Sequence, residues 1–435
     1  ITTSGINAFG ILAQSVGGGG GAVLSTGNAV TASALTYGYG NSGDVTIKIN
    51  APITTTGAGA HGVVAQSVRG GGGSITNGTT TTFYNGIKGT SGVVHISQNA
   101  SILVSGAGAS AIKAGSSTDP IVEIAAGVSA IGGVGGAALD FESPLNEVHN
   151  NGTIGTVDGA AGMAVRTLSG DTSITNSGTM IGNIKLSSDG SNLVHNTGTG
   201  TLIAGASLDL GTGTLRNDGV LTSGNAAGSV TRITGSLAQS ASGTMALQVD
   251  HANARVDSFE VSGSATLLGS LRPSLANAGL IAPGKMALGT FLKAPGGVDT
   301  SGLAMGGDTA IMKFAVQQTG GELALSSTAD FNPAGLNADG HRIGAVVAQA
   351  QTQGATTFRT LVARLVDVPT VAQLSQAYWN VSGAAASTVS VSAERMATAF
   401  NRVLLQQAGD APGSRVASAR PQAQAAGGGT WVVRR

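Results

Sequence analysis

Short runs of apolar residues alternating with polar ones recur along most of the chain. The clearest runs span residues 44–49, 93–97, 244–249 and 322–325. They are rich in β-branched residues and are bounded by Gly, Asn, Ser and Thr, which is typical of short strands between turns. The pattern therefore predicts many short β-strands.

Two phrases repeat between these runs. Residues 10–16 (GILAQSV) return as residues 62–68 (GVVAQSV), each soon followed by a run of glycines, and Gln14 and Gln66 are 52 residues apart. Fainter echoes follow at residues 106–114 and 159–166. The second phrase, Asn-x-Gly-Thr or a close variant, has glycines 26, 20 and 21 residues apart at Gly152, Gly178, Gly198 and Gly219. Short strands at such a period indicate a solenoid.

A parallel β-helix explains both the repeats and the residues used. Each coil lays a strand about 4.8 Å from the same strand of the previous coil, so small aliphatic side chains stack inside. Asn and Gly tolerate the left-handed backbone angles that the corners require. Residues 1 to about 230 therefore predict roughly ten coils, on the order of 50 Å long.

The pattern changes twice towards the C-terminus. From residue 234 to about 330 the strands are less regular, and we expect them to close the open end of the solenoid. After Pro333, residues 342–348 and 358–366 carry apolar side chains at helical spacing, and a longer helix is predicted over 384–407. Residues 409–429 are rich in Pro, Gly, Ala and Ser, which is typical of a linker, and residues 431–435 resemble the start of a strand.

The expected fold is therefore all-β, a right-handed parallel β-helix solenoid with a C-terminal β cap, followed by an α-helical linker segment. The parts predicted in chain order are the β-helix repeats (1–233), the β cap (234–330), the α-helical linker (331–408), and a flexible linker with the start of a strand (409–435).

Composition narrows the class of protein. Glycine makes up 70 of 435 residues, charged residues 10% and aromatic residues 3%, unlike an ordinary soluble enzyme. Disorder is a poor fit because 41% of the chain is hydrophobic. The formal net charge of +0 argues against a nucleic-acid partner, and the absence of cysteine excludes disulfides and thiol catalysis. No apolar stretch reaches about 18 residues, so no transmembrane helix is predicted.

The N-terminal residues give a separate indication. The chain opens at Ile1 with no initiator Met and no signal peptide, inside a pattern that is already running. We therefore expect it to be a fragment of a longer protein.

Glycine-rich motifs do not predict a cofactor site. Residues 57–62 fit Gly-x-Gly-x-x-Gly, but no acidic residue lies between Asp44 and Asp119 to hold a ribose. The glycines of 17–21 and 70–73 lack the Lys-Ser/Thr of a phosphate loop. Residues 132–137 resemble a calcium-binding repeat but have Ala137 in place of the ligand Asp. We expect residues 57–62 to be a plain β-helix turn and the two glycine runs to be flexible or tightly turning loops, and the sequence predicts no cofactor.

Catalytic motifs are equally weak. Gly-x-Ser-x-Gly does not occur, and residues 170–173 only distantly echo the Gly-Asp-Ser motif of secreted esterases and proteases. None of the histidines has zinc-protease spacing, and we expect them to be solvated loop or strand residues. These histidines are His61, His95, His149, His195, His251 and His341.

A polysaccharide lyase or hydrolase on a β-helix would need carboxylates that meet on adjacent coils. The densest acidic group consists of Glu123, Asp140, Glu142 and Glu147. Sequence alone leaves open whether these side chains converge or lie in polar loops. We therefore predict no enzyme, and no catalytic, cofactor-binding or metal-binding residue.

Three segments in series resemble one family, the bacterial type V autotransporters, which combine a secreted β-helical passenger with a C-terminal outer-membrane barrel. The repeated phrase followed by a glycine run resembles repeats of such passengers. Residues 234–244 and 256–271 are similar to the autochaperone region, and residues 373–404 are similar to the segment leading into the translocator. The family's first barrel strand often opens with a Trp, like Trp431.

This resemblance implies a location and partners. The chain would be a passenger located at the bacterial cell surface or outer membrane, or it would be secreted. It would have a structural or adhesive role and would contribute to virulence. Its C-terminal β region would fold first and template the coils, and the helix near 384–407 would thread or plug the lumen of the barrel. The implied partners are the outer-membrane β-barrel translocator of the same polypeptide, whose barrel is absent from these residues, and a host-cell or neighbouring bacterial surface. The resemblance implies no nucleic acid and no small-molecule cofactor. The alternative is a β-helical lyase or hydrolase acting on extracellular polymers.

Overall fold

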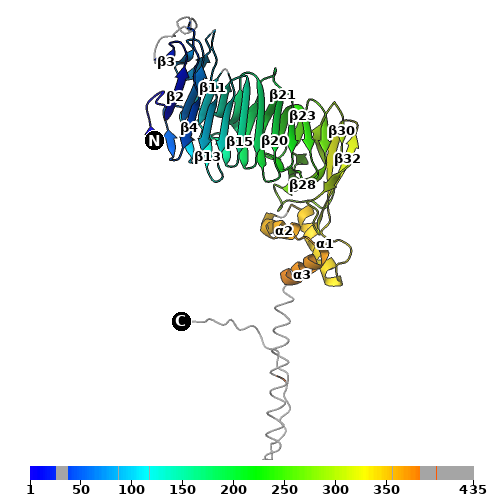
Figure 1. Cartoon of the computed structure of the whole chain (residues 1–435). Helices are drawn as coiled ribbons and strands as arrows, with labels where there is room; N and C mark the ends of the chain where they lie inside the picture. Colours follow the sequence, from blue (N-terminus) through cyan, green and yellow to red (C-terminus); the bar gives the residue numbers. More distant parts are fainter. Residues whose placement is uncertain (26–37, 87, 117, 355, 383–397, 399–435) are drawn as a thin grey trace, which may run out of the picture. The chain divides into compact units, whose positions relative to one another are not determined.

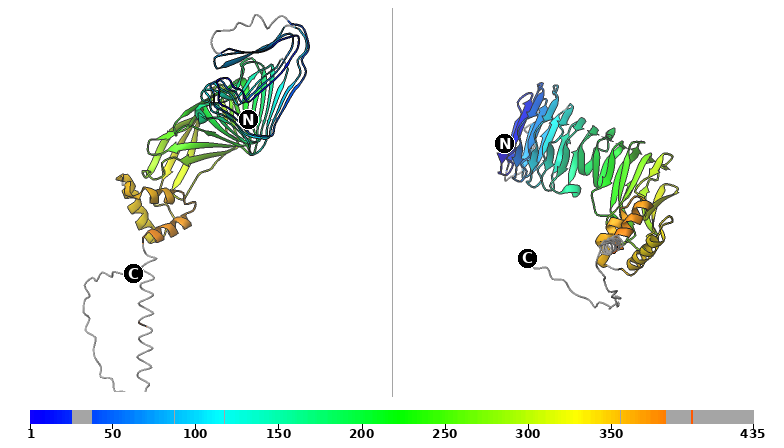
Figure 2. Two further views of the ribbon diagram at one scale, coloured as in Figure 1. Left: turned by 90° about the vertical axis from the view of Figure 1, so that its left-hand side faces the viewer. Right: turned by 90° about the horizontal axis from the view of Figure 1, so that it is seen from below.

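The computed structural model describes residues 1–25, 38–86, 88–116, 118–354, 356–382 and 398. Residues Ile1–Leu374 form one compact unit and Ser375–Arg435 a second. The first unit confirms the predicted parallel β-helix, in which successive coils stack strand on strand along three faces (Figures 1 and 2). We call these faces A, B and C, in the order in which the chain visits them in each coil.

The strands of each face pair in parallel with those of the neighbouring coils. Face A contains β4 (Val45–Ile49), β9 (Val94–Gln98), β12 (Pro120–Ile124), β15 (Leu145–Asn150), β18 (Asp171–Asn176), β20 (Asn192–Asn196), the end of β21 (Thr201–Asn217), the end of β23 (Val230–Gln239), β27 (Ala265–Leu267) and β30 (Val298–Asp299). Face B contains β1 (Thr2–Thr3), β5 (Ile53–Thr55), β10 (Ile102–Val104), β13 (Ser129–Gly132), β16 (Thr153–Thr156), β19 (Thr179–Lys185), the start of β21, β22 (Val220–Ser223), β24 (Thr244–Asp250), β28 (Gly269–Leu275) and β31 (Leu303–Met305).

Face C carries the pocket described below. It contains β2 (Ile11–Val16), β6 (Val63–Val68), β11 (Ile112–Ser116), β14 (Ala137–Glu142), β17 (Met163–Thr167), the end of β19, the middle of β21, the start of β23, β26 (Ser258–Val261) and β29 (Gly284–Lys293). Two short elements interrupt the coils, the 3-10 turn η2 (Gly159–Ala161) and the strand β25 (Arg255–Val256), which pairs antiparallel with β24.

The second repeated phrase places one buried asparagine in each of four coils, at equivalent positions of face A. Asn150 donates to Asn176 (2.6 Å), Asn176 to Asn196 (2.8 Å) and Asn196 to Asn217 (2.8 Å) through their side-chain amides. Asn217 continues the series by donating to Gln239 Oε1 at 3.2 Å. We call this row the asparagine ladder. Its in-register contacts explain the uneven period of the Asn-x-Gly-Thr phrase. A coil can vary in length provided that its asparagine lies next to the asparagine of the neighbouring coil.

The number of coils is smaller than predicted. Up to residue 223, face B has eight described strands (β1, β5, β10, β13, β16, β19, β21 and β22), whereas roughly ten coils were expected. The difference arises at the N-terminus, where Gln14 and Gln66 are register partners 52 residues apart and Val45 pairs with Val94. These first coils are long because part of the chain leaves them to build a second sheet.

That second sheet consists of β3 (Gly21–Ser25), β7 (Gly73–Asn77) and β8 (Thr80–Tyr84). Strand β3 pairs in parallel with β7, and β7 and β8 form an antiparallel hairpin. The two glycine runs bring backbone against backbone here, since a Cβ on Gly20 would lie 1.7 Å from the carbonyl oxygen of Gly72. Of the flexible or tightly turning loops that the sequence left open, the structure therefore has the tightly turning kind.

The parallel coils continue beyond residue 233, which lies inside β23, as far as β31. Much of the segment predicted as a β cap (234–330) therefore belongs to parallel coils, and, apart from the short strand β25, antiparallel strands follow only after β31. These are β32 (Met312–Thr319) and β33 (Glu322–Ala329), the latter pairing with both β32 and β29. An antiparallel hairpin covers the edge that a parallel stack otherwise leaves open.

The predicted helices at 342–348 and 358–366 are confirmed by α1 (Ala338–Thr352) and α2 (Arg359–Val366), which are joined by the 3-10 turn η3 (Thr356–Phe358). Helix α3 spans Val371–Val381. The side chain of Asn337 caps α1 by accepting a hydrogen bond from the Gly340 amide at 2.7 Å. Apart from residue 398, the helix predicted over 384–407 lies outside the described residues, as do the linker at 409–429 and the strand at 431–435.

Candidate functional site

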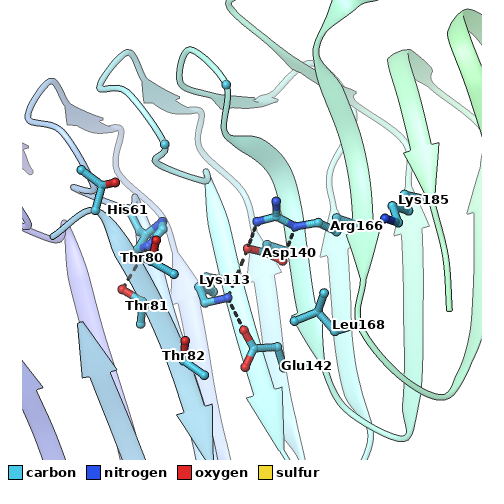
Figure 3. Close-up of a pocket in the computed structure, with 13 residues that line it drawn as sticks. His61, Thr80, Thr81, Thr82, Lys113, Asp140, Glu142, Arg166, Leu168 and Lys185 are labelled. Atoms are coloured by element: carbon cyan, nitrogen blue, oxygen red, sulfur yellow. Dashed lines mark hydrogen bonds and ion pairs between the residues drawn. The ribbon is translucent and has the colours of Figure 1, made fainter. Parts of the chain in front are cut away.

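The β7–β8 hairpin and face C enclose a pocket of about 490 Å³ (Figure 3). The hairpin contributes Thr79–Thr82, and the strands of face C contribute a row of charged side chains. Register explains the row, because each of these residues is the partner of the next on the neighbouring strand. We call it the charge ladder: Lys113 (β11), Asp140 (β14), Arg166 (β17), Lys185 (β19) and Asp209 (β21).

Asp140 is the centre of the charge ladder and is only 2% exposed. Arg166 donates to both of its oxygens, from Nε at 3.1 Å and from Nη2 at 2.6 Å, and Lys113 Nζ lies 3.2 Å from Oδ2. Burial by itself would raise the pKa of Asp140, but the charge of Lys113 and the bonds from Arg166 outweigh it and hold that pKa below its ordinary value. The same contacts raise the pKa of Arg166. Asp140 is therefore a carboxylate held between two cations.

Lys113 also binds a second carboxylate. Its Nζ lies 2.6 Å from Oε1 of Glu142 and 5.2 Å from the ring centre of Phe83. The other oxygen of Glu142 accepts a hydrogen bond from the Phe83 amide at 2.9 Å. Glu142 thus connects the β7–β8 hairpin to face C. The ammonium group of Lys113 forms ion pairs with both Glu142 and Asp140.

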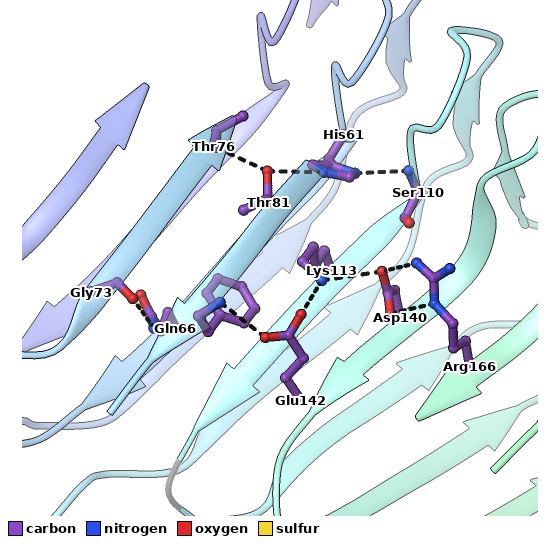
Figure 4. Close-up of polar contacts among 11 residues, drawn as sticks. His61, Gln66, Gly73, Thr76, Thr81, Ser110, Lys113, Asp140, Glu142 and Arg166 are labelled. Carbon is purple, nitrogen blue, oxygen red and sulfur yellow. Dashed lines mark hydrogen bonds and ion pairs between the residues drawn. The ribbon is translucent and has the colours of Figure 1, made fainter. Parts of the chain in front are cut away.

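His61 forms a second link between the hairpin and the coils, through the polar contacts drawn in Figure 4. Its Nδ1 accepts a hydrogen bond from the Ser110 amide at 2.8 Å, so in the neutral ring Nε2 carries the hydrogen and donates to Thr81 Oγ1 at 3.2 Å. Burial and the nearby positive charge of Lys113 lower the pKa of His61 to about 4. The expectation that the histidines are solvated is wrong for His61 and His251, each only 2% exposed, because a β-helix interior and its cap admit a polar ring whose nitrogens are both bonded.

The four acidic residues singled out in the sequence do not form one cluster. Asp140 and Glu142 lie on β14 of face C. Glu123 and Glu147 lie on face A, where they pair with His95 at 3.3 Å and with His149 at 2.8 Å. Within the described residues no group of three His, Asp or Glu side chains is placed to hold a metal ion.

The site can hold charge but is poorly suited to acid–base catalysis. A glycosidase needs a carboxylic acid whose pKa is raised, so that it can donate a proton to the leaving oxygen. Asp140 has the opposite environment, because both of its oxygens accept hydrogen bonds from cations. The arrangement instead fixes the side chain of Arg166 beside the pocket.

Sequence reasoning found Asp140 and Glu142 but missed Lys113, Arg166 and Lys185. No motif connects them, because the coils that separate them differ in length. The β-strand alternation and the repeat period could have placed these charges on one face only if each coil length had been known in advance.

Among the residues that the structure describes, no helix combines the length and apolar character needed to cross a membrane. Comparison with protein-family models, with curated proteins and with solved structures found no match in any of the three.

Proposed function

We propose that this chain is the surface-exposed or secreted passenger of a type V autotransporter, with a structural or adhesive role. Its C-terminal part would assist passenger folding and translocation across the outer membrane. The observation that carries this proposal is the order of its parts, a long stack of parallel coils, then an antiparallel cap, then helices. This order is the one that the family resemblance implies.

The interior of the stack supports a structural role. The asparagine ladder and the aliphatic residues beneath each face make every coil depend on its neighbours, as expected of a solenoid that folds by adding coils to a preformed end. The capped end offers such a starting point, because β33 pairs there with both β29 and β32. A chain without cysteine also suits export in an unfolded form, since no disulfide loop can form within it.

The alternative, a lyase or hydrolase acting on extracellular polymers, is less well supported. Of the four acidic residues singled out in the sequence, Glu123 and Glu147 lie on face A. The other two, Asp140 and Glu142, lie on face C, and both form ion pairs with Lys113. A structural and adhesive role requires no reacting group.

Surface exposure tests the proposal. A short epitope inserted after Gly127 lies in an exposed turn between β12 and β13, where nothing approaches the position of a Cβ. We expect an antibody to bind intact bacteria producing the full-length gene product with this insertion, and external protease to remove the signal, while a cytoplasmic marker stays unlabelled. Labelling only after the cells are permeabilised would contradict the proposal.

A further inference from the structure

The charge ladder contains one pair of like charges on neighbouring rungs. Lys113 and Asp140 carry opposite charges, as do Asp140 and Arg166, and Lys185 and Asp209. Arg166 and Lys185, however, are register partners on β17 and β19 and are both cations. Neighbouring strands lie about 4.8 Å apart, and like charges directly opposite each other destabilise a sheet. This pair therefore places two cations side by side at the edge of the pocket, and only Arg166 has a carboxylate bonded to it.

Both cations have donors to spare. Arg166 uses Nε and Nη2 on Asp140, but its Nη1 has no hydrogen-bond partner within the described part of the chain. Lys185 is exposed and forms no ion pair with any described residue, Asp209 included. Figure 3 shows the two side chains next to each other on the pocket wall. Asp140 fixes the guanidinium at the pocket wall, so Nη1 is held there with its donors free.

The rest of the pocket fits a sugar better than a bare ion. Its volume of about 490 Å³ greatly exceeds the roughly 30 Å³ share of one water molecule. The hydroxyl groups of Thr80 and Thr82 line the opposite wall and have no hydrogen-bond partner among the described residues. Leu168, which is 59% exposed, adds an apolar surface against which a sugar ring can pack.

We propose that this pocket binds an acidic saccharide, whose carboxylate or sulfate group lies between Arg166 and Lys185 and whose hydroxyl groups face Thr80 and Thr82. The inference deepens the proposed adhesive role and rests on it for the source of the ligand, a polymer outside the cell. The observations that carry it are the two adjacent cations, of which Lys185 has no ion-pair partner among the described residues, and the polar pocket beside them.

Calorimetry on the purified chain tests the inference with four probes: hexagalacturonate for the carboxylate, a sulfated hexasaccharide for the sulfate, maltohexaose as a neutral sugar, and a single-stranded DNA oligonucleotide of similar charge. We expect binding of hexagalacturonate, of the sulfated sugar or of both, the pattern identifying the acidic group. Binding should weaken as salt rises. Equal affinity for maltohexaose or for the oligonucleotide, or no binding of either acidic sugar, would overturn the inference.

Lys185→Gln is the decisive variant, because the side chain is exposed and the change should leave the fold intact. We expect it to weaken binding of the acidic sugar about tenfold. Lys48→Gln is the matched control, since Lys48 is also exposed but lies on face A, and it should leave the affinity unchanged. Equal affinities of Lys185→Gln and the wild type, with equal melting temperatures, would overturn the assignment. Epitope labelling of cells does not depend on sugar binding. A negative calorimetry result therefore leaves the proposed location intact, and a negative labelling result leaves the pocket assignment intact.

Discussion

At the scale of single residues, the buried charges of Lys113 and Asp140 beside the pocket are paired to specific partners. Lys113 is 3% exposed and Asp140 2%. Removing such charges from water costs several kcal/mol each, so they are tolerated only with close opposite charges and hydrogen bonds. Lys113 has two carboxylates and Asp140 two cations. The ion pair of Lys113 and Asp140 therefore serves to position face C against the hairpin more than to increase the stability of the fold.

His61 predicts a pH dependence of stability. Its pKa in the folded state, about 4, lies below its ordinary value of 6.5, so the folded state resists protonation of the ring. Its contribution is complete above pH 6.5 and is lost as the pH falls towards 4, which lowers the free energy of unfolding by about 3 kcal/mol. A proton on Nδ1 would also break the bond from the Ser110 amide.

Urea unfolding at several pH values between 4 and 7 measures this effect, with His61→Gln as the comparison. We expect the stability of the wild type to fall more steeply than that of the variant as the pH decreases. His251, whose pKa burial also lowers, is present in both proteins, and so are the neighbouring Lys113, Asp140 and Arg166. Parallel curves for the two proteins would show that His61 does not titrate in this way.

At the scale of elements, the asparagine ladder shows how far the sequence predicts the fold. The spacings of 26, 20 and 21 residues between phrases indicate stacked coils, and the structure pairs Asn150, Asn176, Asn196 and Asn217 in register. The second sheet was not predictable in the same way. Strands β3 and β7 follow glycine runs whose path depends on close backbone contacts between coils, which no local pattern encodes.

Asn176→Ala tests the ladder as a unit. The Asn176 amide donates to Asn196 and accepts from Asn150, so its loss removes one hydrogen bond from each of these two buried neighbours. We expect the free energy of unfolding to fall by about 2 kcal/mol or more. Asn151→Ala, at an exposed position beside the ladder, is the control and should change stability by less than about 0.5 kcal/mol. Equal effects of the two substitutions in urea unfolding would show that the ladder does not stabilise the stack.

At the scale of the whole molecule, the candidate site exists only because the coils stack in register. Lys113, Asp140, Arg166 and Lys185 lie far apart in sequence, and they meet because each takes the equivalent position of face C in its coil. The sequence predicted the solenoid, its cap and the first helices. It could not predict the charge ladder, since a shift of a single residue in any coil would turn a charged side chain to the other side of its strand.

The register of neighbouring coils is thus the central claim, and disulfide trapping tests it directly because the chain has no cysteine of its own. Ser173 and Leu193 are exposed register partners on β18 and β20, with an expected Cα separation of about 4.8 Å, within the range of a disulfide. Ser191 is also exposed but is offset by two residues from the partner of Ser173, at about 8 Å.

On mild oxidation, we expect the pair Ser173→Cys with Leu193→Cys to form an intramolecular disulfide rapidly and completely, as measured by loss of free thiols and by mass spectrometry. The pair Ser173→Cys with Ser191→Cys should keep its thiols. Equal trapping of the two pairs, or trapping of the offset pair alone, would contradict the in-register β-helix and with it the charge ladder.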